Sequence, residues 1–117
     1  MEELVSIVTP TFNSANYIAE TIQSVQNQTY QYWEMIIVDD GSTDETLSII
    51  QDIQKVESRI QLIIQEKNAG PAITRNKGIE LAKGNYLTFL DADDIWFPDF
   101  IQNSINTIQQ TNIPFVF

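Results

Sequence analysis

The sequence predicts an α/β fold, an open and mostly parallel sheet with helices on both faces. Short apolar runs rich in β-branched residues alternate with stretches whose apolar residues recur at helical spacing, and this alternation is typical of parallel sheets. Three of the apolar runs stop directly at acidic or hydroxyl-bearing residues. A chain of 117 residues has room for one compact domain.

The chain begins with a predicted strand and helix. A β-branched run at 4–8 predicts a buried strand that Thr9-Pro10 ends. The polar stretch 13–16 favours a helix start, and Tyr17 opens a series of apolar residues at helical spacing. We therefore expect a helix over 17–25.

The next elements repeat this order. Residues 33–38 predict a second strand that ends in Asp39-Asp40-Gly41. Ser42 and Glu45, three positions apart, predict a capping box ahead of a second helix. Residues 60–64 predict a third strand.

The second half adds two helices and a further strand. Proline opens a predicted helix over 71–81, residues 86–90 predict a fourth strand, and that strand runs into the acids of 91–94. A last helix is expected over 98–110, and 115–117 resemble the start of a fifth strand. Because a domain does not normally close on the first residues of a strand, we expect a fold truncated on its C-terminal side.

Composition excludes several kinds of chemistry. The chain has no cysteine and no histidine, which excludes disulfides, thiolate zinc sites and imidazole bases. Sixteen acids against six bases give a net charge of −10, a poor match for nucleic acid. Acids near the N-terminus, and the lack of any apolar run of about 18 residues, predict a cytoplasmic protein with no membrane span in this segment.

The acids after the fourth predicted strand are the strongest chemical signal. On an extended backbone Asp91 and Asp93 point to the same side, where two carboxylates repel each other unless a divalent cation binds them. Mg²⁺ and Mn²⁺ prefer such oxygen ligands, and an acidic solvated loop is the alternative. At the second strand end, Asp39 and Asp40 fit either a turn with a helix cap or a binding group.

Arg75 is the candidate cation for an anionic ligand. It lies in the helix that begins near Pro71 and is one of only six bases; a solvated surface position is the alternative. No Walker A or Gly-x-Gly-x-x-Gly pattern occurs, so a diphosphate would depend on a metal ion and Arg75 for neutralisation.

Four ordered motifs resemble those of family 2 glycosyltransferases. They are VSIVTPTFN (5–13), IIVDDGSTD (36–44), NAGP (68–71) and FLDADD (89–94). The resemblance covers nearly the whole chain. It implies the GT-A fold, with residues 1–117 as its N-terminal nucleotide-sugar-binding part, and inverting transfer of a sugar from a nucleoside-diphosphate sugar.

The resemblance implies a nucleoside pocket at the first two strand ends. Thr9, Pro10 and Phe12 would line it, and Phe12 stands where many members have Tyr, which keeps ring stacking but removes a hydroxyl. Asp40 would hydrogen-bond the base, while Asp39 would assist at the pocket or hold the turn.

The same resemblance implies a diphosphate and metal site. Arg75 would lie near the base or the phosphates. Asp91, Ala92 and Asp93 match the Asp-x-Asp motif: Asp93 would contact Mn²⁺ or Mg²⁺, Asp91 would contact the ribose or a metal-bound water, and Ala92 belongs with the nucleotide-binding residues. Asp94 is an extra acid whose part the resemblance leaves open.

The implied reaction uses a UDP-sugar as the first expectation for the donor and a saccharide or lipid-linked acceptor. It would take place in the cytoplasm, and for the full-length protein at the inner face of the cell membrane. In the family the carboxylate base lies further along the chain. We therefore expect no catalytic base within residues 1–117, and weak or absent transfer by this chain alone.

Two other kinds of protein remain as alternatives. One is a nucleotide-sugar-binding module without catalytic duty, and the other is a self-associating fragment, a homodimer paired through the edge at 115–117. A phosphorylatable receiver domain fits poorly, because its acidic pair follows the first strand and a lysine follows its fifth. Here no lysine occurs after Lys83.

Overall fold

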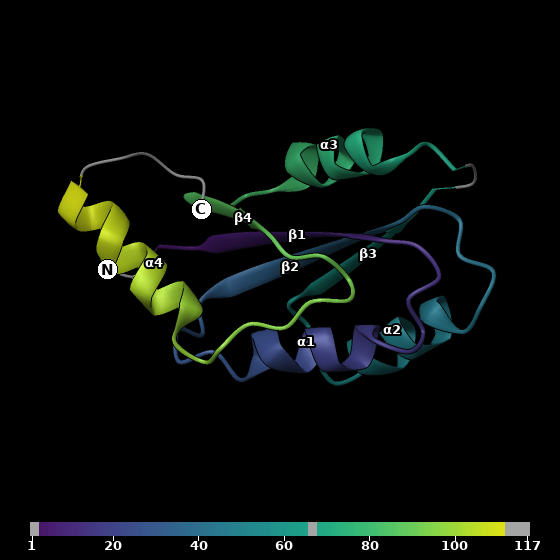
Figure 1. Ribbon diagram of the computed structural model, residues 1–117, viewed down its shortest axis with the longest axis horizontal. Helices are drawn as coiled ribbons and strands as arrows, with labels where there is room; N and C mark the ends of the chain where they lie inside the picture. Colours follow the sequence, from purple (N-terminus) through teal and green to yellow (C-terminus); the bar gives the residue numbers. More distant parts are fainter. Residues whose placement is uncertain (1–2, 66–67, 112–117) are drawn as a thin grey trace.

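The computed structural model describes residues 3–65 and 68–111 and confirms the predicted α/β fold (Figure 1). Strands and helices alternate along the described residues. Their bounds are β1 Val5–Thr11, α1 Ile18–Gln26, β2 Trp33–Asp39, α2 Thr46–Gln54, β3 Ile60–Ile64, α3 Pro71–Leu81, β4 Tyr86–Phe89 and α4 Phe100–Thr111.

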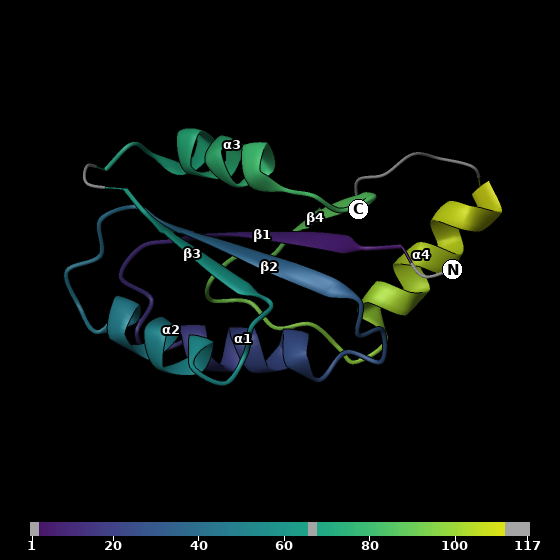
Figure 2. The same ribbon diagram turned by 180° about the vertical axis from the view of Figure 1, so that it is seen from behind.

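The strands form one parallel sheet in the order β3-β2-β1-β4. Val5 of β1 pairs with Trp33 of β2 on one side and with Tyr86 of β4 on the other. Helices α1 and α2 lie on one face of the sheet and α3 on the other, while α4 lies near the end where β1 begins (Figures 1 and 2). The strand order reverses between β1 and β4, and ligands of such sheets bind at the carboxyl ends of the strands at this switch point.

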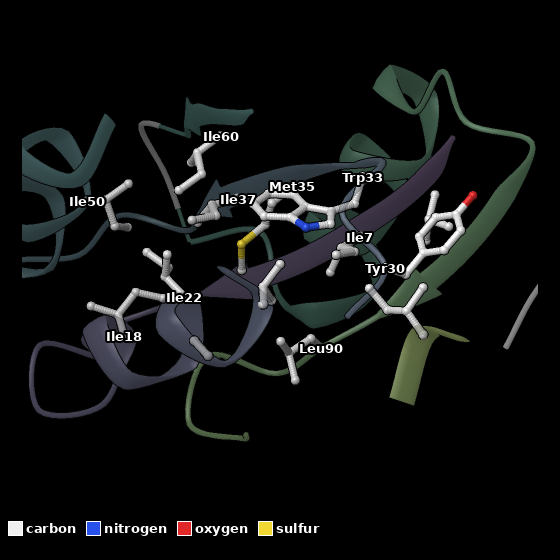
Figure 3. Packing of buried hydrophobic residues seen from close by; sticks show 14 of the residues in the cluster. Ile7, Ile18, Ile22, Tyr30, Trp33, Met35, Ile37, Ile50, Ile60 and Leu90 are labelled. Carbon is white, nitrogen blue, oxygen red and sulfur yellow. The ribbon is translucent and has the colours of Figure 1, made fainter. Parts of the chain in front are cut away.

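The hydrophobic core lies between the sheet and helices α1 and α2 (Figure 3). Ile18 and Ile22 of α1 and Ile50 of α2 are fully buried there, as are alternate strand residues such as Met35. Tyr17 belongs to the same apolar series in the sequence but is 55% exposed. It precedes the first turn of α1, so its side chain stays out of the core.

Helix α3 packs on the opposite face without an apolar stripe. Its buried residues are Thr74 and Gly78, and a Cβ at Gly78 would lie 2.4 Å from Val8 Cγ1 of β1. Glycine therefore allows the helix backbone to approach the sheet closely. The close approach holds α3 against β1 and β2.

Several element boundaries differ by one to three residues from the sequence-based expectation. β1 continues past Thr9-Pro10 to Thr11, because β4 pairs with it only as far as Val8 and leaves one side of the strand open to a proline. α4 begins at Phe100, slightly later than expected. The expected fifth strand at 115–117 lies outside the described residues. Within the described part, no helix is both long and apolar enough to cross a bilayer.

The expected capping box is wrong. α2 begins at Thr46 and has no side-chain cap at Glu45. The Ser42 hydroxyl instead donates to Asp39 Oδ1 at 2.5 Å, and Asp44 Oδ1 accepts the Thr46 backbone N–H at 3.0 Å. Because the Ser42 hydroxyl is bonded to Asp39 at the end of β2, Ser42 does not cap helix α2.

Candidate functional site

A cavity of about 590 Å³ opens at the carboxyl ends of β1, β2 and β4. It lies at the switch point of the sheet, and its volume suits a nucleotide-sized ligand. The lining residues are 10–14, Tyr17, Asp40, Asn68, 70–71, 74–75 and 91–93.

Seven of the residues singled out from the sequence lie in this wall, and two lie behind it. Those in the wall are Pro10, Phe12, Asp40, Arg75, Asp91, Ala92 and Asp93. Thr9 and Asp39 are fully buried and do not line the cavity.

Asp39 holds the turn that follows β2. Its Oδ2 accepts the backbone N–H groups of Gly41 (3.1 Å) and Ser42 (2.8 Å), and its Oδ1 accepts the Ser42 hydroxyl. Gly41 has φ +90, a backbone conformation that glycine adopts without strain. Thr9, by contrast, has a buried Oγ1 with no hydrogen-bond partner among the described residues.

Asp40 ties the end of β2 to the start of α3. Its carboxylate accepts the N–H of Ala69 (2.7 Å), the N–H of Gly70 (3.1 Å) and Gln65 Nε2 (3.2 Å). A carboxylate has about four acceptor positions, so about one remains, and Asp40 is among the residues that line the cavity. Asp40 thus fixes the loop before α3 and still offers an acceptor to a ligand.

The start of α3 places Arg75 in the cavity wall. Gly70 has φ +90 at the helix N-cap, and its carbonyl accepts the Thr74 hydroxyl at 2.7 Å. One turn into the helix, the Arg75 guanidinium lies 5.5 Å from the centroid of the Phe89 ring. Arg75 forms no ion pair within the described residues, so its N–H donors are available to an anion.

The loop after β1 is fixed by Asn13, which is not among the site residues predicted from the sequence. Asn13 has φ 47; asparagine tolerates this conformation better than most residues, and that tolerance is the signal the sequence carried. Its Oδ1 accepts the Thr43 N–H at 2.8 Å, and its own N–H donates to the Ser42 hydroxyl at 2.8 Å. This contact fixes Phe12, whose ring is 46% exposed in the cavity wall.

Two further hydrogen bonds join the loop after β1 to the segment between β2 and α2. Ser14 N–H donates to the Thr46 hydroxyl at 2.8 Å, and Ala15 N–H donates to Asp44 Oδ2 at 3.2 Å. The hydrogen bond from the Thr46 hydroxyl lowers the pKa of Asp44 below its ordinary value. Tyr17 follows this joint and lines the cavity, a position that its apolar spacing did not suggest.

The acids after β4 form a turn, so the extended geometry expected for them is wrong. β4 ends at Phe89, and Asp94 N–H donates to Asp91 O at 3.0 Å. We call residues 91–94 the acidic turn. Asp91 and Asp93 are exposed and line the cavity, whereas Asp94 accepts the Ile95 N–H at 3.0 Å and does not line it.

The acidic turn fits a divalent cation bound together with a ligand. Asp91 and Asp93 make no side-chain hydrogen bond or ion pair with the described residues, so their oxygens are available. Three carboxylates and one guanidinium in the wall give a formal charge of −2. The described part has no cluster of three or more side chains able to hold a metal ion, so a cation would rely on two carboxylates and on ligand oxygens, as Mg²⁺ commonly does.

Comparison with known proteins matches the chain to one family. The family model described as glycosyl transferase family 2 matches residues 6–116. The putative teichuronic acid biosynthesis glycosyltransferase TuaG of Bacillus subtilis (strain 168) is 43% identical over 97% of this chain and 45% of its own length. The UDP-Glc:alpha-D-GlcNAc-diphosphoundecaprenol beta-1,3-glucosyltransferase WfgD of Escherichia coli is 37% identical over 97% of this chain and 44% of its own length. The chain thus spans less than half of either relative.

Two solved structures that resemble this fold were determined with a bound nucleotide. S. aureus TarS 1-349 in complex with UDP matches with a TM-score of 0.85 and 30% identity, over 92% of this chain and 32% of that chain. The mannosyltransferase PcManGT from Pyrobaculum calidifontis in complex with GDP-Man and Mn²⁺ matches with a TM-score of 0.86 and 26% identity, over 92% and 33%. These similarities confirm the GT-A fold that the motifs imply.

Proposed function

The chain belongs to glycosyl transferase family 2, and we propose that its cavity binds the nucleoside-diphosphate sugar of a sugar-transfer reaction. One observation carries the proposal: an exposed aromatic ring, a carboxylate with a remaining acceptor, and a guanidinium and two carboxylates that form no ion pair with the described residues all line the same cavity. Each of these groups matches one part of such a ligand.

The base is proposed to bind between the ends of β1 and β2. Phe12 offers a ring face for stacking and Pro10 an apolar wall. The remaining acceptor of Asp40 suits a base with an imino N–H, which uracil and guanine both carry. The neighbouring structures bind UDP and GDP-Man, and we propose UDP first.

The diphosphate is proposed to lie between Arg75 and the acidic turn. Asp93 would hold Mn²⁺ or Mg²⁺ directly, and Asp91 would hold the ribose or a metal-bound water. A bound cation would neutralise the departing diphosphate. Arg75 would donate N–H groups to the same phosphates, which stabilises the charge that develops on the leaving group.

The proposed reaction is an inverting displacement onto a saccharide or lipid-linked acceptor. The relative WfgD is named as a glucosyltransferase that acts on GlcNAc-diphosphoundecaprenol, a lipid-linked acceptor, which supports this class. A base must deprotonate the acceptor hydroxyl. We propose that residues 1–117 form the donor-binding half and that acceptor and base belong to the length that the relatives have in addition. Sugar transfer by this chain alone would overturn that division.

Calorimetric titration tests the proposal. The chain is titrated with UDP in the presence of Mn²⁺ and again with a chelator, after circular dichroism has established that it is folded. Asp93→Ala is compared with Asp52→Ala, a matched control that removes an exposed carboxylate of α2. We expect Mn²⁺-dependent binding by the parent and by Asp52→Ala, and none by Asp93→Ala.

Failure of a folded chain to bind UDP, GDP or thymidine diphosphate would overturn the proposal. Binding unaffected by the chelator would overturn the metal site but leave the nucleotide pocket. Self-association through 115–117 remains a separate prediction, which sedimentation velocity over a range of concentrations checks.

A further inference from the structure

Helix α1 reaches across the fold to the acidic turn. The Thr21 hydroxyl donates to the carbonyl oxygen of Ala92 at 3.0 Å. Thr21 is 1% exposed and Ala92 is 6% exposed, so the bond is sheltered from water. We propose that Thr21 is a positioning residue, which holds the acidic turn and so orients the Asp93 carboxylate toward the metal-bound diphosphate.

The carboxylates depend on the turn backbone for their direction. Asp91 and Asp93 flank Ala92, and neither side chain bonds another described residue. The sheet ends just before them, since Leu90 N–H still donates to Val8 O at 3.1 Å. Within the described residues, the bond from Thr21 is the one hydrogen bond that joins 91–94 to another element.

The packing of Ala92 and the hydrogen bond from the Thr21 hydroxyl constrain the acidic turn in different ways. The methyl group of Ala92 belongs to the hydrophobic core, which holds the turn in place but allows rotation of the peptide group. A hydrogen bond to the Ala92 carbonyl fixes that peptide plane. This peptide joins Ala92 to Asp93, so its plane sets the direction in which the Asp93 side chain leaves the backbone, and a preorganised ligand binds a cation without an ordering cost.

The inference rests on the proposed function, because it assigns the acidic turn to the metal-bound diphosphate. It predicts different effects on the binding of the diphosphate and of the nucleoside. Loss of the Thr21 hydroxyl should weaken binding of the diphosphate with Mn²⁺ and leave binding of the nucleoside unchanged, since the base meets β1 and β2 rather than the turn.

The experiment compares three variants on helix α1. Thr21→Val keeps the shape and removes the hydroxyl, and Thr21→Ser restores the hydroxyl. Ser24→Ala is the matched control, because the Ser24 hydroxyl is also buried on α1 but donates to the Thr21 carbonyl in its own helix, at 2.7 Å. Thermal unfolding establishes that each variant is folded.

Two readouts are taken. Amide hydrogen exchange at Asp94, whose N–H closes the turn, is measured without ligand. The affinities for UDP with Mn²⁺ and for uridine with chelator are measured by calorimetry. In Thr21→Val we expect exchange at Asp94 about tenfold faster and UDP affinity about tenfold lower, with the uridine affinity of the parent. Thr21→Ser and Ser24→Ala should behave like the parent in both readouts.

Parent-like exchange at Asp94 in Thr21→Val would overturn the inference, and so would an equal effect of Ser24→Ala. A fall in UDP and uridine affinity by the same factor would also overturn it, because that result indicates general loosening. If the parent itself binds no nucleotide, the proposed function fails, while exchange at Asp94 still decides whether Thr21 holds the turn.

Discussion

The two ends of the sheet differ in whether their charged side chains form ion pairs within the described residues. At the amino end, the Arg59 guanidinium donates to both oxygens of Glu57 at 2.8 and 3.0 Å and lies 3.7 Å from the centroid of the Trp33 ring. At the carboxyl end, Arg75 and the two cavity-lining carboxylates of the acidic turn form no ion pair within the described residues. Charges paired inside the fold stabilise the fold, whereas unpaired charges around a cavity are available to a ligand.

The largest expected effect comes from removing the unpaired acids. The double variant Asp91→Asn and Asp93→Asn should lower Mn²⁺-dependent UDP affinity at least about 30-fold, or roughly 2 kcal/mol. Its urea midpoint should match that of the parent, because neither carboxylate bonds another described residue. Calorimetry and urea unfolding measure the two quantities. A large loss of stability would break the comparison, since the acids would then support the fold.

Asp40 sharpens the comparison because it is a paired acid at the binding end. Ala69 and Gly70 donate to different oxygens of Asp40. In Asp40→Asn one of these oxygens becomes an NH₂ group, which cannot accept, so one backbone N–H loses its partner. We expect the free energy of unfolding to fall by about 1–2 kcal/mol and UDP affinity to fall about tenfold. Urea unfolding and titration on the same sample check both. A change in only one would show that fold and binding are separable here.

Arg59 tests the amino end. Arg59→Met should lower the free energy of unfolding by about 1–2 kcal/mol, because it removes charge-assisted hydrogen bonds and a contact with the Trp33 ring. UDP affinity should not change. Arg59→Lys keeps the charge but not the planar fork, and should recover part of the stability. Reduced nucleotide binding by a folded Arg59→Met would contradict the separation of the two ends.

The smallest expected effect is an acid dependence at the amino end. The hydrogen bonds from Arg59 hold the pKa of Glu57 down, from its ordinary 4.5 to about 2. Their stabilising effect is fully present above pH 4.5 and is lost as the pH falls toward 2. Between about pH 5 and pH 3, the urea midpoint of the parent should fall more than that of Glu57→Gln. Equal slopes would mean that the pair contributes no stability.

The strands could be predicted because each is a short run of mostly apolar residues, many of them β-branched. The runs at 33–39 and 60–64 are recognisable whatever packs on them. The grouping of the acids at the strand ends could also be predicted, because the carboxyl ends of parallel strands lie at the same edge of the sheet. Pro10, Phe12 and Arg75 were expected near a ligand and do line one cavity.

The errors arise where contacts made in the folded chain decide a local structure. Ser42 fits a capping box by its spacing, but Asp39 and Asn13 take its hydroxyl. The acidic turn ends the extended backbone immediately after β4, because Ala92 is drawn into the core. The spacing of residues along the chain shows neither the hydrogen bonds of Ser42 nor the burial of Ala92. The hydrogen bond between Thr21 and Ala92 likewise becomes visible only in the folded structure.

The strand order also has a consequence for how the chain assembles. Val5 pairs with Trp33 and with Tyr86, which lies almost three times as far along the chain. Closing the longer loop costs about 1 kcal/mol more in chain entropy, and long-range pairing slows folding. We therefore expect β1, β2 and β3 to associate first during synthesis and β4 to dock afterwards. The carboxylates proposed to hold the cation follow β4 directly, so they would be positioned only after β1, β2 and β3 have formed a sheet.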